Sequence, residues 1–236
     1  MHLEKKRGLW YTEQTRLTAM SRRHGETTTM KTLYIFLTRS GTLLSNLVYR
    51  LTGAQYTHIS LAFDEDLSTL YSSTRKNGYT MFPAGPSREY LNRGVFLMRE
   101  NIPCALYALE VTDEAYVRAK RRTQHMMHHG ELYRFNSLGL LLCWMHIRWQ
   151  RRRHYFCSQF VSEVLQKSGA LDLPKPSTLM HPSDYAELPQ LRCLYRGTLA
   201  DLPQRQSMEL GEVESVMGLY LNVLLGAVKG RVRRLF

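Results

Sequence analysis

The chain has 236 residues, of which 44% are hydrophobic and 22% charged, a balance typical of a protein with a packed core. Its four cysteines are widely spaced and form no CxxC pair; they are Cys104, Cys143, Cys157 and Cys193. This spacing argues against a zinc ribbon, a CxxC redox pair and a small disulfide scaffold, and it favours reduced thiols in the cytoplasm.

The net charge of +12 favours anionic partners. The basic residues gather in three runs, at 118–122, 148–153 and 229–236. No zinc-finger, RNA-recognition or basic-zipper signature accompanies these runs. We therefore interpret them as solvated helix faces or tails rather than as a nucleic-acid surface.

Residues 1–29 are polar and basic, and they lack the apolar stretch that a secretory signal requires. We predict that they form a disordered or non-native extension. No apolar run reaches the ~18 residues of a membrane-spanning helix, so we expect a cytoplasmic protein.

In the first half of the chain, apolar patterns predict mostly strands. We expect strands at 32–37, 57–63, 70–74, 95–98 and 105–111, a helix at 42–51 and an ordered loop at 75–93. An acidic turn at 64–66 separates two of these strands, which predicts that they pair antiparallel.

Helices dominate the second half. We expect helices at 113–129, 137–149 and 157–166, a short helical turn, a strand at 192–195 and an amphipathic helix at 209–229 with a basic end. Thr112 is predicted to cap the first helix, Gly130 to end it, and Gly169 to end the third. The order of elements predicts an α+β fold, a small antiparallel sheet packed against helices. We divide the chain into the extension at 1–29, a domain at 30–205 and a C-terminal helix with a basic tail at 206–236.

The segment HYFCSQFVSEVL, residues 154–165, places Cys157 in the first turn of a predicted helix, because the apolar stripe begins at Phe160. Unpaired backbone N–H groups and the helix dipole at this end favour a thiolate, the form that attacks a carbonyl. The alternative is a buried structural cysteine, which is the commoner fate of a lone cysteine.

The segment QYTHISLAF, residues 55–63, places His58 in a strand, on the same face as Ser60 and Ala62. From a rigid sheet, its imidazole can take a thiol proton at a neighbouring helix end, or pair there with a thiolate as imidazolium. Taken alone, His58 is better explained as a histidine hydrogen-bonded at the sheet surface. The two segments together favour a Cys–His pair.

The segments YTHISLAFDEDLSTLYSSTRKN and HYFCSQFVSEVL together resemble the circularly permuted branch of the NlpC-like, papain-fold superfamily of cysteine hydrolases. In this branch the histidine strand precedes the cysteine helix, as His58 precedes Cys157. The resemblance covers residues 31–202 and is strongest to small, mostly uncharacterised bacterial proteins, with a more distant relation to lecithin:retinol acyltransferase-like proteins. It implies a papain-like permuted NlpC fold with the nucleophile at a helix N-terminus.

Members of this family usually carry a third polar residue on the strand after the histidine strand, where it orients the imidazole. The resemblance places Ser72 in this role, although a serine hydroxyl carries no charge that would stabilise imidazolium. Asp64 and Glu65, in the preceding turn, are the alternatives.

The backbone N–H of Cys157 would stabilise the oxyanion that forms when a carbonyl is attacked. We assign Tyr56 and Ser158 to the wall of the same pocket. The alternative for Tyr56 is an aromatic ring packed at the sheet edge.

Other histidines form weaker candidate sites. His125 and His129 have the i, i+4 spacing of metal ligands, but a third ligand is not evident, and a cationic helix end is the simpler interpretation. We therefore expect no metal and no cofactor. His154 competes with His58 as the base, but the chain enters a helix there, and we expect the His154 side chain to point away from Cys157.

These features favour a cysteine-dependent amide or ester hydrolase that works through an acyl-thioester on a small acyl, peptide or lipid substrate. One alternative is a lipid acyl hydrolase or acyltransferase at an anionic membrane, which the C-terminal basic helix would contact. The other is a ligand-binding module that keeps the fold without turnover.

Overall fold

The computed structural model of the chain describes residues 29–39, 53–76, 83–99 and 101–208. By its internal contacts the chain divides into two units, Met1–Met30 and Lys31–Phe236, and the fold below is that of the second. The predicted helices at 42–51 and 209–229 lie outside the described residues, as does nearly all of the predicted extension at 1–29.

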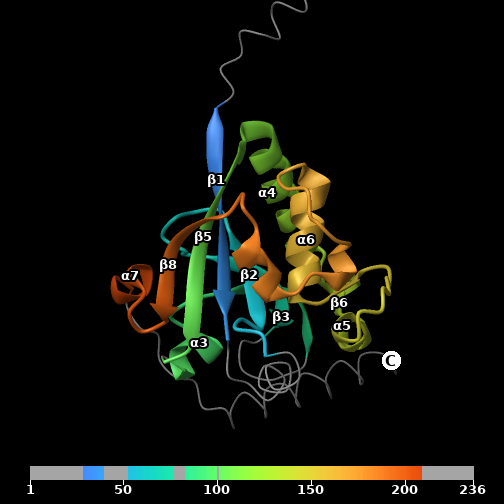
Figure 1. Ribbon diagram of the computed structural model, residues 1–236, viewed down its shortest axis with the longest axis horizontal. Helices are drawn as coiled ribbons and strands as arrows, with labels where there is room; N and C mark the ends of the chain where they lie inside the picture. Colours follow the sequence, from blue (N-terminus) through green and yellow to red (C-terminus); the bar gives the residue numbers. More distant parts are fainter. Residues whose placement is uncertain (1–28, 40–52, 77–82, 100, 209–236) are drawn as a thin grey trace, which may run out of the picture. The chain divides into compact units, whose positions relative to one another are not determined.

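A six-stranded sheet with the strand order β4-β3-β2-β1-β5-β8 forms the framework of this unit (Figure 1). The strands are β1 (Met30–Thr38), β2 (His58–Ala62), β3 (Leu70–Arg75), β4 (Ala84–Glu89), β5 (Pro103–Thr112) and β8 (Arg192–Thr198). The pairs β1–β2, β2–β3, β3–β4 and β5–β8 are antiparallel, which confirms the predicted hairpin of β2 with β3. An antiparallel sheet combined with helices confirms the predicted α+β class.

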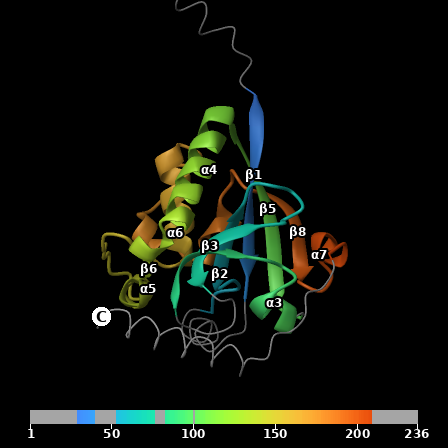
Figure 2. The same ribbon diagram turned by 180° about the vertical axis from the view of Figure 1, so that it is seen from behind.

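Two helices, α4 (Asp113–His128) and α6 (Cys157–Ser168), lie side by side against the sheet, with α6 on β2 and β3 (Figures 1 and 2). Between them in sequence come β6 (Arg134–Phe135), α5 (Ser137–Trp144) and β7 (His154–Tyr155), with β6 and β7 paired parallel. The shorter elements are α3 (Gly94–Met98), η1 (Gly130–Leu132), η2 (Ser177–Leu179), η3 (Pro182–Glu187) and α7 (Pro203–Gln206).

The alternating side chains of β1 enter two apolar cores. Leu33, Ile35 and Leu37 join the core formed with α4 and α6, whereas Tyr34 and Phe36 join a second core with residues of α3 and of the segment before α7. Because apolar partners cover both sides of β1, its sequence is a continuous apolar run rather than an alternating one.

The prediction of an ordered loop at 75–93 is wrong in part, because this range contains β4. The prediction of a strand at 95–98 is also wrong, because these residues belong to the helix α3. β4 lies at the edge of the sheet, where a strand tolerates a residue such as Pro86 that has no N–H to donate. The short apolar run GVFLM of α3 has too few residues for periodicity to separate helix from strand.

The helix predicted at 137–149 ends early, at Trp144. Two residues later, His146 has a φ of 59°, in the left-handed region that a right-handed helix cannot contain. The apolar composition before this point predicts the helix. Its end could not be predicted, because a non-glycine residue with positive φ leaves no recognisable signal in the sequence.

The predicted helix ends are confirmed where a local cap fixes them. The hydroxyl of Thr112 accepts a hydrogen bond from the N–H of Ala115 at the start of α4, and Gly169 ends α6 with a φ of 71°. The helix α4 ends at His128 with His129 as its C-cap, so Gly130, the predicted end, comes directly after the cap and begins η1. The described residues include no helix with the length and hydropathy of a membrane span.

Candidate active site

Cys157 is the first residue of α6, and only 7% of its surface is exposed. Phe156 before it has extended backbone and donates no side-chain cap, so the first N–H groups of the helix are free of a capping side chain. The carbonyl of Tyr155 accepts hydrogen bonds from the Ser73 hydroxyl of β3, at 2.6 Å, and from the N–H of Asn136, at 3.2 Å. The sheet therefore fixes the position at which the cysteine helix begins.

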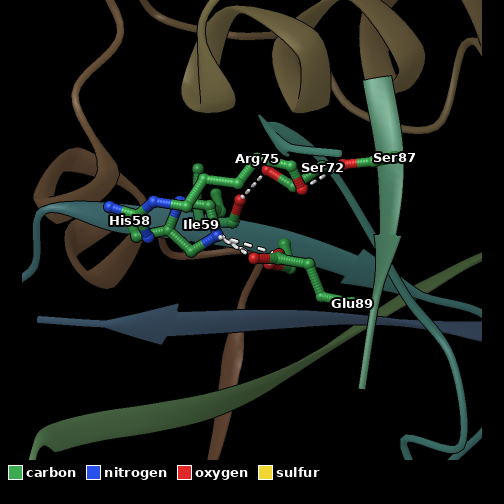
Figure 3. Close-up of polar contacts among 7 residues, drawn as sticks. His58, Ile59, Ser72, Arg75, Ser87 and Glu89 are labelled. Carbon is green, nitrogen blue, oxygen red and sulfur yellow. Dashed lines mark hydrogen bonds and ion pairs between the residues drawn. The ribbon is translucent and has the colours of Figure 1, made fainter. Parts of the chain in front are cut away.

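His58 begins β2, and a carboxylate contacts its ring. The His58 Nε2 lies 2.9 Å from Oε2 and 3.1 Å from Oε1 of Glu89, the last residue of β4 (Figure 3). The hydroxyl of Ser60 donates to the same Oε2 at 2.6 Å. The side chains of His58 and Glu89 are 12% and 15% exposed, so both are largely withdrawn from water.

The charges around His58 favour its protonated form. Burial lowers the pKa of His58, but the charge of the Glu89 carboxylate, with a smaller contribution from Cys157, outweighs burial and raises the pKa to about 10. Cys157, which the sequence proposes as the nucleophile, is therefore near enough to His58, the proposed base, to affect the pKa of its ring.

The pKa of Glu89 is lowered in the same arrangement. Burial raises it, but the positive charge of His58, hydrogen bonds from His58 and Ser60, and the charge of Arg75 together outweigh burial. The pair is thus a carboxylate beside an imidazolium, which is the charged state that a serine partner could not stabilise.

Ser72 does not take the orienting position that the sequence predicts for it. Its buried hydroxyl donates to the carbonyl of Ile59 at 2.7 Å, while Glu89 contacts the His58 ring (Figure 3). A serine side chain inside a strand is too short to reach beyond the neighbouring backbone, whereas the longer glutamate spans from the edge strand across β3. The alternatives Asp64 and Glu65 are exposed to solvent.

Sequence reasoning missed Glu89 because it assigned 75–93 to a loop. One signal was available: Glu89 is the only acidic residue in that range. Had residues 84–89 been predicted as a strand, this single carboxylate at the end of the strand would have been a candidate partner for His58.

The two residues assigned to the oxyanion pocket have other contacts. The hydroxyl of Ser158 donates to the carbonyl of Met180 at 2.6 Å. Tyr56 is 1% exposed and packs in the core with α6. Its backbone N–H and carbonyl both bond to the Ser183 hydroxyl at 3.1 Å, whereas its own hydroxyl is buried and has no hydrogen-bond partner in the part of the chain that the structure describes. Of the donors considered, the backbone N–H of Cys157 is the one whose position at a helix start suits an oxyanion.

A second cysteine and histidine lie close together. The Cys143 Sγ is 3.7 Å from Nε2 of His181. Burial raises the pKa of Cys143 to about 12, while burial lowers the pKa of His181. This second pair is therefore a neutral thiol with a neutral imidazole, and it lacks the carboxylate that accompanies His58.

The competing histidines have local partners. The His154 Nδ1 lies 2.8 Å from the carbonyl of Arg152, which turns its ring toward the preceding loop. The rings of His125 and His129 lie 4.6 Å apart near the end of α4. In the part of the chain that the structure describes, no group of three or more His, Cys, Asp or Glu side chains could hold a metal ion.

No family model, curated protein or solved structure matches this chain. The resemblance to the permuted NlpC branch therefore rests on the sequence motifs, and it stays a prediction. The contact of His58 with Glu89 and the influence of Cys157 on the pKa of His58 are independent of that resemblance, and they are the basis of the proposal that follows.

Proposed function

We propose that the chain is a cysteine-dependent amide or ester hydrolase with a permuted papain-like fold. Cys157 is the nucleophile, His58 transfers the proton, and Glu89 orients and charges the imidazole. The observation that carries the proposal is the contact of the His58 ring with a buried carboxylate, together with the influence of Cys157, a cysteine at a helix start, on the pKa of that ring.

The two ring nitrogens have separate tasks in this scheme. Nε2 donates to Glu89, so in this scheme Nδ1 is the nitrogen that exchanges the proton with the thiol and the leaving group. The contact with the carboxylate restricts rotation of the ring.

The reaction follows from these positions. The sulfur attacks the substrate carbonyl, and the N–H of Cys157 stabilises the oxyanion that forms. The His58 imidazolium then gives its proton to the leaving amine or alcohol as the carbon–heteroatom bond breaks, which leaves an acyl-thioester and a neutral imidazole. Water, deprotonated by that imidazole, hydrolyses the thioester and restores the starting charges.

The alternative of a binding module without turnover is weakened. Its motivation was an uncharged orienting residue, Ser72, that could not stabilise imidazolium. Glu89 supplies the missing negative charge, and a buried carboxylate–imidazolium pair beside a cysteine is costly to keep unless the charges have a use.

Alkylation of the full chain by iodoacetamide, followed site by site by mass spectrometry, tests the proposal. We expect Cys157 to react about 10-fold or more faster at pH 6.5 than Cys193, the exposed cysteine of the chain, despite its burial. His58→Ala should remove this advantage without changing the rate at Cys193. Cys157 should also be required for hydrolysis of a p-nitrophenyl ester, which Cys157→Ser would abolish. A rate at Cys157 below that at Cys193 at every pH between 6 and 9 would show that the thiol is not activated.

A further inference from the structure

The helix α5 exposes apolar side chains that the described part of the chain leaves uncovered. Leu138 and Leu141 are 52% and 51% exposed, and Met145 and Ile147, just after the helix, are 52% and 46% exposed. Leu138, Leu141 and Met145 follow one another at helical spacing, which places them on one face. Four of the nine large exposed hydrophobic residues in the described part lie in these ten residues, so they form a cluster rather than a random scatter.

Arginines flank this apolar face along the chain. No aspartate or glutamate occurs from residue 132 to residue 162. The same stretch carries five exposed arginines, namely Arg134, Arg148, Arg151, Arg152 and Arg153. None of the five forms an ion pair with another described residue. The N–H of Arg134 donates to the carbonyl of Arg153 at 3.0 Å, which brings the two ends of the basic stretch together.

We propose that α5 and the segment after it, residues 138–153, bind the surface of a membrane that contains anionic lipids. Exposed leucine, methionine and isoleucine next to arginines form the pattern of an interfacial segment, in which apolar side chains enter the head-group region and cations contact the phosphates. Trp144 and Trp149 are partly exposed in the same segment, and tryptophan is enriched at membrane interfaces.

A lipid surface fits this segment better than nucleic acid does. Aliphatic side chains neither stack on bases nor hydrogen-bond to their edges, so a nucleic acid would leave the apolar face without a partner. An anionic membrane accommodates the apolar face and the arginines at the same time. The proposed segment, residues 138–153, precedes in sequence the C-terminal basic helix that the sequence suggests as a membrane contact.

The surface is joined to the helix of the candidate nucleophile at both of its ends. The Asn136 side chain, which caps the start of α5, donates to Oε1 of Gln159 at 3.1 Å. Gln159 in turn donates from Nε2 to Oε1 of Gln150 at 3.2 Å. Because Gln159 is two residues after Cys157, a membrane bound at α5 lies beside the first turn of α6. The proposal concerns binding and does not depend on the thiol chemistry.

Sedimentation of the full chain with vesicles tests the proposal. We expect binding to vesicles of phosphatidylcholine with phosphatidylglycerol, and much weaker binding to phosphatidylcholine alone. The double variant Leu141→Ser/Met145→Ser should bind about 10-fold or more weakly. Arg151→Gln/Arg152→Gln should reduce the preference for anionic vesicles and the sensitivity of binding to salt.

Matched variants on α4 control for general loss of charge or apolar surface. Val117 and Arg121 are exposed on that basic helix, so Val117→Ser/Arg121→Gln should bind as the unaltered chain does. Two of the three tryptophans of the chain, Trp144 and Trp149, lie in the surface, and we expect brominated phosphatidylcholine in the vesicles to quench their fluorescence.

Three outcomes would overturn the proposal. The first is no binding to anionic vesicles, and the second is an equal loss of binding in the α4 and α5 variants. The third is tight binding of polyuridylate that the α5 variants abolish, in a chain that does not bind vesicles. Cys157→Ala should bind vesicles as tightly as the unaltered chain. Failure of the membrane proposal and failure of the hydrolase proposal are therefore distinguished by separate measurements.

Discussion

Glu89 acts on His58 through its charge as well as through its hydrogen bonds. Ser60 donates to one of its oxygens while the imidazole contacts both, so the carboxylate has little freedom to rotate. A neutral amide of the same shape could keep one hydrogen bond to the ring. It could not, however, provide the attraction that is the largest of the effects raising the pKa of His58.

Glu89→Gln should therefore separate charge from shape. We expect the pKa of His58 to fall toward its ordinary value, and ester hydrolysis at neutral pH to drop by about 10²-fold or more. The pKa can be followed by NMR of the His58 ring, and the rate with a p-nitrophenyl ester.

Ser72→Ala is the matched control for this substitution. It removes one buried hydrogen bond to the Ile59 carbonyl and should destabilise the fold by about 1 kcal/mol, with hydrolysis retained. The reverse pattern, with Ser72→Ala inactive and Glu89→Gln active, would restore serine to the orienting role.

The sequence predicts the parts of the site that depend on local pattern, and it misses the part that depends on tertiary pairing. Cys157 is recognisable because an apolar stripe at helical spacing follows it. His58 is recognisable because it is a polar residue in an otherwise apolar strand pattern. Glu89 reaches the ring only through the pairing of β4 with β3 and of β3 with β2. Since that pairing is not encoded in the residues next to Glu89, residue patterns alone did not reveal its role.

Among the elements, α6 has the clearest limits, because each end is fixed by a different device. The sheet holds the chain two residues before its start through the Tyr155 carbonyl, and Gly169 ends it in the left-handed conformation. The Arg118 Nε donates to the Ser168 carbonyl at 2.8 Å, so α4 also holds the last turn. The apolar stripe from Phe160 and the glycine at 169 are local signals, and they explain why α6 was predicted within two residues, whereas β4 was assigned to a loop.

Gly169→Ala should destabilise the protein by about 1–2 kcal/mol, because alanine in the left-handed region places its Cβ too close to the following carbonyl. An added Cβ would also lie 3.4 Å from the Arg118 guanidinium. Urea unfolding followed by circular dichroism measures the change.

Gly130→Ala is the control, since an added Cβ there meets its nearest neighbour at an ordinary 3.7 Å and the backbone has no positive φ. We expect a change within about 0.5 kcal/mol. Equal destabilisation by both substitutions would mean that the conformation of Gly169 does not stabilise the end of α6.

For the molecule as a whole, the His58–Glu89 pair makes the free energy of unfolding depend on pH. The pKa of His58 is raised from 6.5 to about 10, so its contribution is complete below pH 6.5 and is lost as the pH rises through about 10. The pKa of Glu89 is lowered, so its contribution is present above its ordinary value of 4.5 and is lost as the pH falls below it.

We therefore expect the stability difference between the unaltered chain and Glu89→Gln to be greatest near pH 5–6 and to shrink toward pH 10. Urea unfolding of both proteins across this range measures it. A difference that grows with pH would contradict the assignment of an imidazolium at His58.

The clamp at Tyr56 has a consequence for the order in which the molecule assembles. The hydroxyl of Ser183 accepts a hydrogen bond from the N–H of Tyr56 and donates one to its carbonyl. Tyr56 lies 127 positions earlier in the chain, two residues before the histidine strand. Contacts this distant in sequence form only after the intervening chain has folded, because closing so long a loop costs conformational entropy. Because Tyr56 lies two residues before His58, loss of this contact would free the start of the histidine strand, and the alkylation rate of Cys157 would report whether that opening reaches the candidate site.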